Sequence, residues 1–481
     1  MRAASKFAVI PAFRREIIGC ALVAGLGILL IDVILIKYNV YYYSDNVNTL
    51  YPISIHNFMR GNPVRPFEYL ILQAANIVYW PLWLGASLLC TVGATVLSGL
   101  TCECLFERRL QKTGWVLLGL ANPLLFYVIS QPDVVSQALA NLLFAGAMFA
   151  FVSEAHRLSD QPVRGWRGDR VAVFLNLLAA ALFFTKETAV AAATVIPAAT
   201  ALMRYKVGRL SPLFLCSLLF PIAAAISWIV VKLKFPYMLP TELGGIGIGR
   251  YSLKLDLITL VQHFTITLAF SITPLPTSFL AFDLLRPIWI VVALGFVVFF
   301  IILILHVSQC QWRIVGPLLI IAVSCMPMIL LHSSELYSSM IAPFAVSILL
   351  LFGMSNTRWL GLGYGLTLYA ASLTNCIIYC LGADFSLFGL QHLSYSIYSK
   401  GHQFYPICPI GTTAHIAWDG GADSAVPYHP GLKGRIICLR MESSMPFKSS
   451  FSLWRVPSGD IPNPTQSIEW REYRSAALPS N

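Results

Sequence analysis

Long apolar runs, separated by short polar segments, dominate the chain as far as residue 379. Crossing a bilayer core of ~30 Å takes about 20 apolar residues, so runs of near-spanning length predict eleven transmembrane helices. The fold class expected from this pattern is an all-α polytopic membrane protein. Nine of the helices stand alone in the sequence, at Glu16–Ile36, Trp80–Phe106, Trp115–Ser130, Val134–Glu154, Pro212–Val231, Pro287–His306, Ile314–Leu331, Met340–Met354 and Trp359–Tyr379.

The remaining two helices are expected within Val171–Met203, an apolar stretch that is too long for one crossing. A single helix of this length would measure about 50 Å. Arginines and lysines flank both ends, which places both ends on the same face of the membrane. We therefore predict a turn at Thr185-Lys186-Glu187-Thr188, with Lys186 and Glu187 at its outer tip. The alternative is a single tilted helix with a buried Lys–Glu pair.

Two further helices are expected outside the regular crossings. Phe67–Val78 reads as a short helix that lies along the membrane surface. An apolar helix near Leu257–Phe270 either re-enters the membrane or lies flat on it. Segments predicted to be inside carry sixteen lysines and arginines, against nine on outer loops before residue 380, which favours a cytoplasmic N-terminus. An odd number of crossings then places the tail outside.

The composition supports the membrane assignment and changes how the charge is interpreted. The chain is 57% hydrophobic and 11% charged, whereas soluble domains carry roughly 25% charged residues. In such a protein the net charge of +11 reports topology and contact with the lipid bilayer, not binding of nucleic acid. No P-loop, dinucleotide fingerprint or HExxH motif is present in the sequence.

The tail has a different composition and marks a second domain. Residues 1–380 form the predicted membrane module, with an outer loop at 37–79, and residues 381–481 form a small extracytoplasmic domain of α/β or β-rich type. Cys408 and Cys438 are the only cysteines in this domain, so we expect a disulfide bond between them in an oxidising compartment. A pair of free thiols is the alternative.

The candidate chemistry lies in the predicted outer loops. Asp45 follows the first span, in the polar segment Lys37–Phe67, where a lipid headgroup and a water-soluble acceptor could meet. A carboxylate there can remove a proton from an acceptor, and nearby cations can stabilise the charge that grows on a leaving phosphate. The alternative is that Asp45 only caps a short interfacial helix. Other acids beside span ends, and basic residues near them, are Asp133, Glu187, Asp283 and Glu335, and Arg60, Arg65, Lys186 and Arg286.

This layout resembles the GT-C superfamily of integral-membrane glycosyltransferases, and bacterial O-antigen glucosyltransferases of the GtrII type in particular. An acid in the first outer loop, the Lys186-Glu187 turn, the segment Leu331–Tyr337 and an outside C-terminal domain carry the resemblance. It implies Asp45 as the catalytic base and Lys186 with Arg65 at the lipid phosphate. The substrate-binding set that it implies is Arg60, Arg65, Asp133, Lys186, Glu187, Arg286, Glu335 and Tyr337.

The resemblance also implies partners and a location. The donor would be a polyprenyl-phosphate-linked sugar and the acceptor a glycan of the cell envelope, such as lipopolysaccharide. The protein would lie in the bacterial cytoplasmic membrane, with its C-terminal domain in the periplasm. Many relatives have paired acids where this chain has Asp45-Asn46, so a divalent metal is possible but not required, and Leu336 stands where an arginine is usual. A polysaccharide polymerase or ligase, and a lipid-linked-glycan transporter or flippase, are the competing functions.

Overall fold

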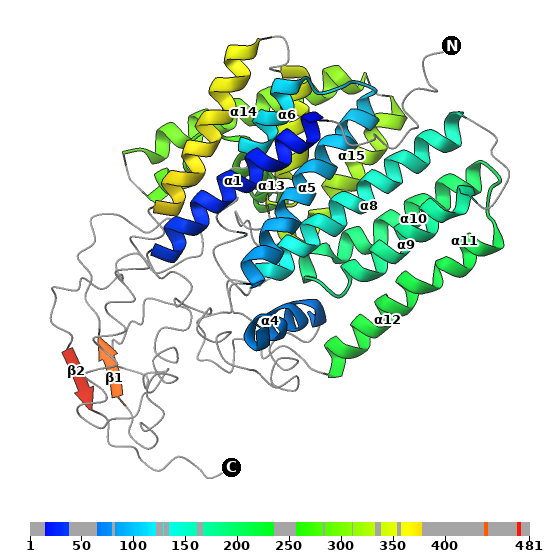
Figure 1. Cartoon of the computed structure of the whole chain (residues 1–481), viewed down its shortest axis with the longest axis horizontal. Helices are drawn as coiled ribbons and strands as arrows, with labels where there is room; N and C mark the ends of the chain where they lie inside the picture. Colours follow the sequence, from blue (N-terminus) through cyan, green and yellow to red (C-terminus); the bar gives the residue numbers. More distant parts are fainter. Residues whose placement is uncertain are drawn as a thin grey trace.

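The computed structural model describes residues 15–37, 65–78, 82–121, 128, 134–160, 167–234, 256–281, 284–309, 311–331, 338–353, 357–377, 437–440 and 469–472. Most of these residues are helical, and Figure 1 shows most of the helices running side by side in one bundle. The first half of the bundle comprises α1 (Arg15–Lys37), α4 (Pro66–Val78), α5 (Leu82–Phe106), α6 (Lys112–Leu120), α8 (Val135–Asp160), α9 (Arg167–Leu182) and α10 (Val190–Lys206).

The second half contains several interrupted helices. Its elements are α11 (Pro212–Ser217), α12 (Leu219–Lys234), α13 (Leu257–Ile272), α14 (Arg286–Ser308), α15 (Trp312–Ser324), α16 (Met326–Leu331), α18 (Ala342–Ile348) and a last helix at 358–377. Short 3₁₀ helices occur at η4 (Glu187–Ala189) and η6 (Thr277–Ala281), and a π-helical turn at η7 (Leu349–Gly353) follows α18.

The membrane class predicted from the sequence is confirmed at this coarse level. Among the described residues, six helical stretches are long and apolar enough to cross a membrane: Arg15–Ile34, Leu82–Phe106, Val135–Leu158, Glu187–Lys206, Pro212–Val231 and Arg286–Ser308. Shorter apolar helices accompany them. The total of eleven crossings remains a prediction.

Proline accounts for two of the differences from the predicted spans. The third span was expected to run from Trp115 to Ser130, but α6 ends at Leu120, and Ala121 has non-helical dihedral angles (φ −93°, ψ 35°). Pro123 lies two residues after Ala121, a position where proline is common because it cannot continue the helix. The ninth span is divided at Cys325, and Pro327 then lies in the first turn of α16, where the missing N–H of a proline has no helical partner.

The stretch Val171–Met203 turns back as predicted. The helix α9 ends at Leu182 and α10 begins at Val190, with η4 between them. The far ends of the two helices meet, since Arg204 Nη1 in the last turn of α10 lies 2.7 Å from Asp169 Oδ1 in the first turn of α9. The pair is therefore an antiparallel hairpin, and the alternative of a single tilted helix is wrong.

Charged contacts tie several loops together at the end of the bundle where Arg204 lies. The buried guanidinium of Arg204 also contacts Glu154 Oε1 at 2.8 Å, and Arg157 lies 2.8 Å from the same carboxylate oxygen. A second contact at a helix end, Arg313 Nη1 to Glu107 Oε1 at 3.0 Å, joins α15 to the end of α5. These arginines were all predicted to be inside. Which face is cytoplasmic remains a prediction.

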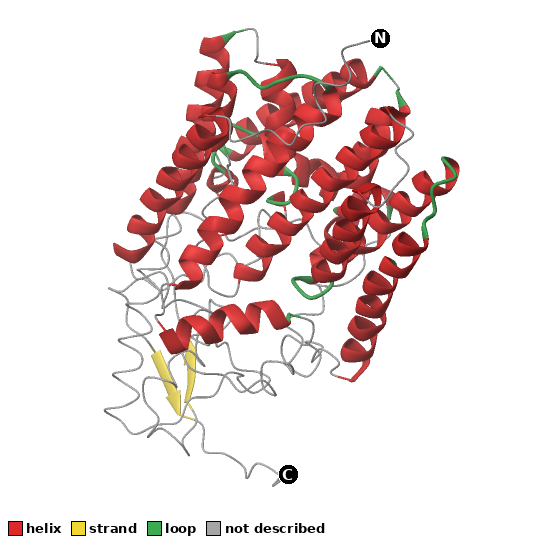
Figure 2. Cartoon of the chain, turned by 45° about the vertical axis from the view of Figure 1, so that its right-hand side comes forward, coloured by secondary structure: helices red, strands yellow, loops and turns green. Residues whose placement is uncertain are grey.

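The helix α4 has the arrangement expected of a surface helix. Figure 2 shows it lying across the ends of the other helices. Glu68, Leu72 and Ala75 form its buried face, whereas Leu70 and Ile77 on the other side are 58% and 80% exposed. The helix α13, by contrast, does not lie flat on the surface. Its residues 267–272 are buried in the bundle, which favours the re-entrant form.

The described part of the tail is a pair of antiparallel strands, β1 (Ile437–Arg440) and β2 (Glu469–Glu472), outside the helical bundle in Figure 1. Their register places Cys438 opposite Arg471. Cys408 lies outside the described residues, so its disulfide bond with Cys438 remains a prediction. The same holds for the boundary of the domain at residue 381.

The helices α1 and α6 approach each other closely at Gly119. A Cβ atom added at Gly119 would lie 2.7 Å from the carbonyl oxygen of Cys20, which is backbone and cannot move aside easily. We expect Gly119→Ala to destabilise the protein by about 1–3 kcal/mol, measured by unfolding in detergent micelles. Gly295→Ala in α14 is the matched control, because nothing lies within 4 Å of its Cβ position. That control should be neutral or stabilising by up to ~1 kcal/mol, and equal losses at both positions would contradict the packing account.

Candidate functional site

The start of α4 supplies the first part of the site. Arg65 precedes Pro66, and proline is favoured at the first helical position because its missing N–H would have no helical partner there. Glu68 lies in the first turn, where the positive end of the helix dipole favours a carboxylate. Arg65 Nη1 lies 3.5 Å from Glu68 Oε2, one turn along the helix. The helix end therefore holds an arginine and a buried glutamate close together.

The turn between α9 and α10 supplies the second part. Lys186 is in extended conformation (φ −143°, ψ 148°), and the 3₁₀ turn Glu187–Ala189 follows it. The Thr185 hydroxyl donates to the carbonyl of Leu182 at 2.8 Å, and the amide of Ala189 donates to that of Lys186 at 2.9 Å. These bonds hold the turn from within. Lys186 is 5% exposed, so its stem is packed into the bundle.

An ion pair joins the two parts across 122 residues of sequence. Arg65 Nε donates to Oε2 of Glu187 at 2.9 Å, and Arg65 Nη2 lies 2.9 Å from the same oxygen. The side chains of Arg65 and Glu187 are 15% and 27% exposed, so the pair is shielded but still reachable from solvent. We call Arg65, Glu68, Lys186 and Glu187 the hairpin-tip site. Its formal charges balance, because it contains two cations and two carboxylates.

The structure thus brings together three of the residues that sequence reasoning assigned to a site: Arg65, Lys186 and Glu187. Arg286 is placed at the start of α14, where its Nε donates to the carbonyl of Leu280 at 2.9 Å. This bond anchors the η6 segment to α14 and does not join Arg286 to the hairpin tip. The other predicted site residues lie outside the described residues, and these are Asp45, Arg60, Asp133, Glu335 and Tyr337.

Glu68 is the member of the site that sequence reasoning missed. It lies in the predicted outer loop at 37–79, but it was not predicted to be a neighbour of Arg65. The available signal was spacing, because residues three apart on a helix lie on the same face. Phe67–Val78 was already expected to be a helix, so extending it by two residues, to Arg65, would have placed Glu68 beside Arg65.

No metal centre is formed by the residues that the structure describes. Nowhere among them do three His, Cys, Asp or Glu side chains gather in a way that could hold an ion. Asp45 lies outside this part of the chain, so metal dependence of the expected chemistry stays open.

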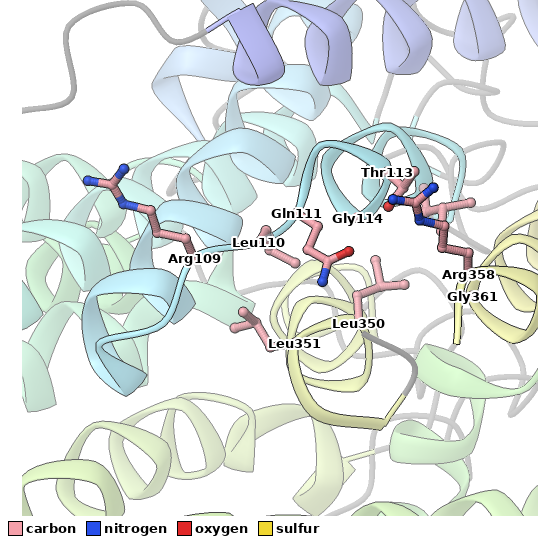
Figure 3. A pocket seen from close by; sticks show the side chains of 10 residues that line it. Arg109, Leu110, Gln111, Thr113, Gly114, Leu350, Leu351, Arg358 and Gly361 are labelled. Atoms are coloured by element: carbon pink, nitrogen blue, oxygen red, sulfur yellow. The ribbon is translucent and has the colours of Figure 1, made fainter. Parts of the chain in front are cut away.

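A small cavity lies elsewhere, where the loop before α6 meets η7 and the last helix. Its volume is about 20 Å³, which is room for roughly one water molecule and far too little for a sugar. Figure 3 shows that Arg109 points away from Gln111 and Arg358 on its rim. The cavity is therefore not a candidate for the substrate site.

Comparison of the chain with protein-family models, with curated proteins and with solved structures finds no match.

The ion pair at the hairpin tip should contribute measurably to stability. Arg65→Gln and Glu187→Gln, made singly and together, should show a coupling of roughly 1–3 kcal/mol, since charged hydrogen bonds contribute more when they are shielded. The matched control is the pair Arg313 and Glu107, whose side chains are 61% and 43% exposed. Its coupling should be about 0.2–1 kcal/mol. Coupling energies from unfolding in micelles check this, and a weaker coupling at the hairpin tip than in the control would contradict it.

Proposed function

We propose that the protein is a membrane glycosyltransferase that moves a sugar from a polyprenyl-phosphate donor to a glycan or lipid-linked acceptor. The transfer takes place at the outer face of the bacterial cytoplasmic membrane. The observation that supports this is the meeting of Arg65 with Glu187, next to Lys186, at one end of the helix bundle. A site for a phosphorylated lipid needs cations and carboxylates at such an end, where the lipid headgroup and water are both within reach.

In this proposal the acceptor hydroxyl attacks the anomeric carbon of the sugar. The bond between that carbon and the phosphate oxygen breaks, polyprenyl phosphate leaves with the electron pair, and the configuration inverts. Asp45 takes the proton from the attacking hydroxyl as general base. Glu187 is the less suitable base, since its Oε2 already accepts a hydrogen bond from Arg65 Nε and lies 2.9 Å from Arg65 Nη2.

The cations of the hairpin-tip site stabilise the departing phosphate in this proposal. Arg65 is engaged by Glu68 and Glu187, so phosphate binding requires it to exchange a carboxylate for a phosphate oxygen. A guanidinium suits this exchange, because it presents five N–H donors in a plane and binds carboxylate and phosphate in the same way. Lys186, next to Glu187, supplies a second positive charge.

A transfer assay tests the proposal directly. Purified protein in micelles is given a panel of polyprenyl-phosphate sugars with a lipid-linked glycan acceptor, and transfer of labelled sugar is measured. Lys186→Ala should weaken use of the donor by about 10- to 150-fold, because a charge-assisted contact to phosphate contributes roughly 1.5–3 kcal/mol. Lys206→Ala, at the opposite end of α10, should leave donor use unchanged. Normal donor saturation in Lys186→Ala would remove Lys186 from the phosphate site.

Asp45→Asn tests the base. It should lower turnover by about 10²- to 10⁴-fold with little effect on folding or donor binding. Asp256→Asn is the matched control, because Asp256 is a helix cap that accepts a hydrogen bond from the amide of Thr259 at 2.8 Å, and asparagine caps almost as well. Wild-type turnover in an inserted Asp45→Asn protein would show that Asp45, like Asp256, is only a cap.

A transporter or flippase of lipid-linked glycans is the second candidate. The interrupted helices favour it, since α15 and α16 are separated at Cys325 and α18 passes into the π-helical turn η7. Broken helices at membrane depth line substrate paths in many transporters. Movement of a fluorescent polyprenyl-phosphate sugar from one leaflet of a vesicle membrane to the other, without sugar transfer to any acceptor, would favour this function over the first.

A further inference from the structure

Four polar side chains from distant parts of the sequence form a continuous buried chain of hydrogen bonds. Thr188 Oγ1 donates to Gln137 Oε1 at 3.0 Å, and Gln137 Nε2 donates to Asn141 Oδ1 at 2.8 Å. Asn141 Nδ2 then donates to Ser339 Oγ at 2.8 Å. All four residues are at most 8% exposed. We call this set the amide relay.

Burying the polar groups of the relay inside an apolar bundle carries a free-energy penalty. A buried amide must have its donors and acceptors satisfied, and apolar side chains of similar volume would pack the same space without that requirement. The amides instead fix the orientation of the side chains that they contact. Each hydrogen bond fixes the orientation of the next, so the relay holds three separate segments in one arrangement.

The segments that the relay joins include the hairpin-tip site. Gln137 and Asn141 lie four residues apart, on one side of the first turns of α8. Thr188 is inside η4, immediately after Glu187. At the other end, Ser339 lies shortly before α18. The relay therefore connects the residue next to Glu187 with the starts of two helices, α8 and α18.

We propose that Gln137 and Asn141 are positioning residues, whose amides hold Glu187 where Arg65 binds it. The relay contacts neither Arg65 nor Glu187 through the bonds described above, so it acts through Thr188. The inference rests on the proposed function in one respect, because it assigns these residues to the site that would bind the donor. A site of this kind needs a frame that fixes its charged groups to within a fraction of an ångström.

Asn141→Leu tests the proposal, because it removes an acceptor and a donor of the relay and keeps the number and branching of the side-chain heavy atoms. The matched control is Asn176→Leu. Asn176 is also fully buried and also donates from Nδ2 to a serine hydroxyl, that of Ser217 at 2.7 Å, but this bond joins α9 to α11 away from the hairpin tip. Both variants lose a buried Asn–Ser bond. Only one loses the relay.

The readout is the coupling between Arg65→Gln and Glu187→Gln, measured by unfolding in micelles in each background. We expect the coupling to persist with Asn176→Leu and to fall by roughly half or more with Asn141→Leu. Thr188→Val is the second variant should Asn141→Leu not fold, since it keeps the shape of the side chain and removes only the hydroxyl that donates to Gln137. It should reduce the coupling in the same direction.

Equal coupling in the Asn141→Leu and Asn176→Leu backgrounds would overturn the proposal, since the relay would then be only a packing feature. Binding of a short polyprenyl phosphate in micelles is measured in parallel. If the unsubstituted protein does not bind this probe but Asn141→Leu still abolishes the coupling, the proposed function fails and the positioning role stands. If the probe binds, Asn141→Leu should weaken its binding more than Asn176→Leu does, and the reverse order would overturn the role in this site.

Discussion

A charged side chain inside an apolar layer needs a partner, and this constraint fixes both ends of the α9–α10 hairpin. At one end Arg204 is almost fully buried and contacts both Glu154 and Asp169. At the other, Glu187 is held by Arg65. Between them α10 has 17 residues, which is about 25 Å of helix and close to the apolar thickness of a bilayer. Each end of the hairpin is thus tied by charged contacts to another part of the bundle, to α8 through Glu154 and to the start of α4 through Arg65.

The same constraint explains why part of this arrangement could be predicted from the sequence. The turn at Lys186 and Glu187 followed from two simple facts: the apolar stretch is too long for one crossing, and basic residues flank both of its ends. Neither fact depends on packing. The early end of α6 is also local in origin, because Pro123 follows soon after it. The apolar run continues past this proline, so the pattern of apolar residues alone predicted a longer helix.

Other features could not be predicted, because they depend on which segments meet. Glu187 was expected to be at an outer tip, but nothing in the sequence identifies Arg65 as the residue that reaches it over 122 positions. Gln137 and Asn141 are harder still. A polar residue in an apolar span can turn towards several neighbouring helices, and only the packing of α8 against the hairpin selects Thr188 and Ser339 as partners. The sequence shows that buried amides here need hydrogen-bond partners, but it does not show which residues supply them.

The two kinds of polar contact at the hairpin tip differ in how readily they can change. The Arg65–Glu187 pair is partly exposed, so an incoming anion can compete with Glu187 for the guanidinium. The amide relay is sealed from solvent, and no ligand can replace its bonds without opening the bundle. Selective binding of a phosphate requires both features: a guanidinium that can exchange its partner, and a surrounding hydrogen-bond network that keeps its own partners. If the amide relay were as exposed as the ion pair, a phosphate could bind Arg65 only by disordering the hairpin turn. The free energy gained from the contact between phosphate and Arg65 would then be offset by the cost of that disordering.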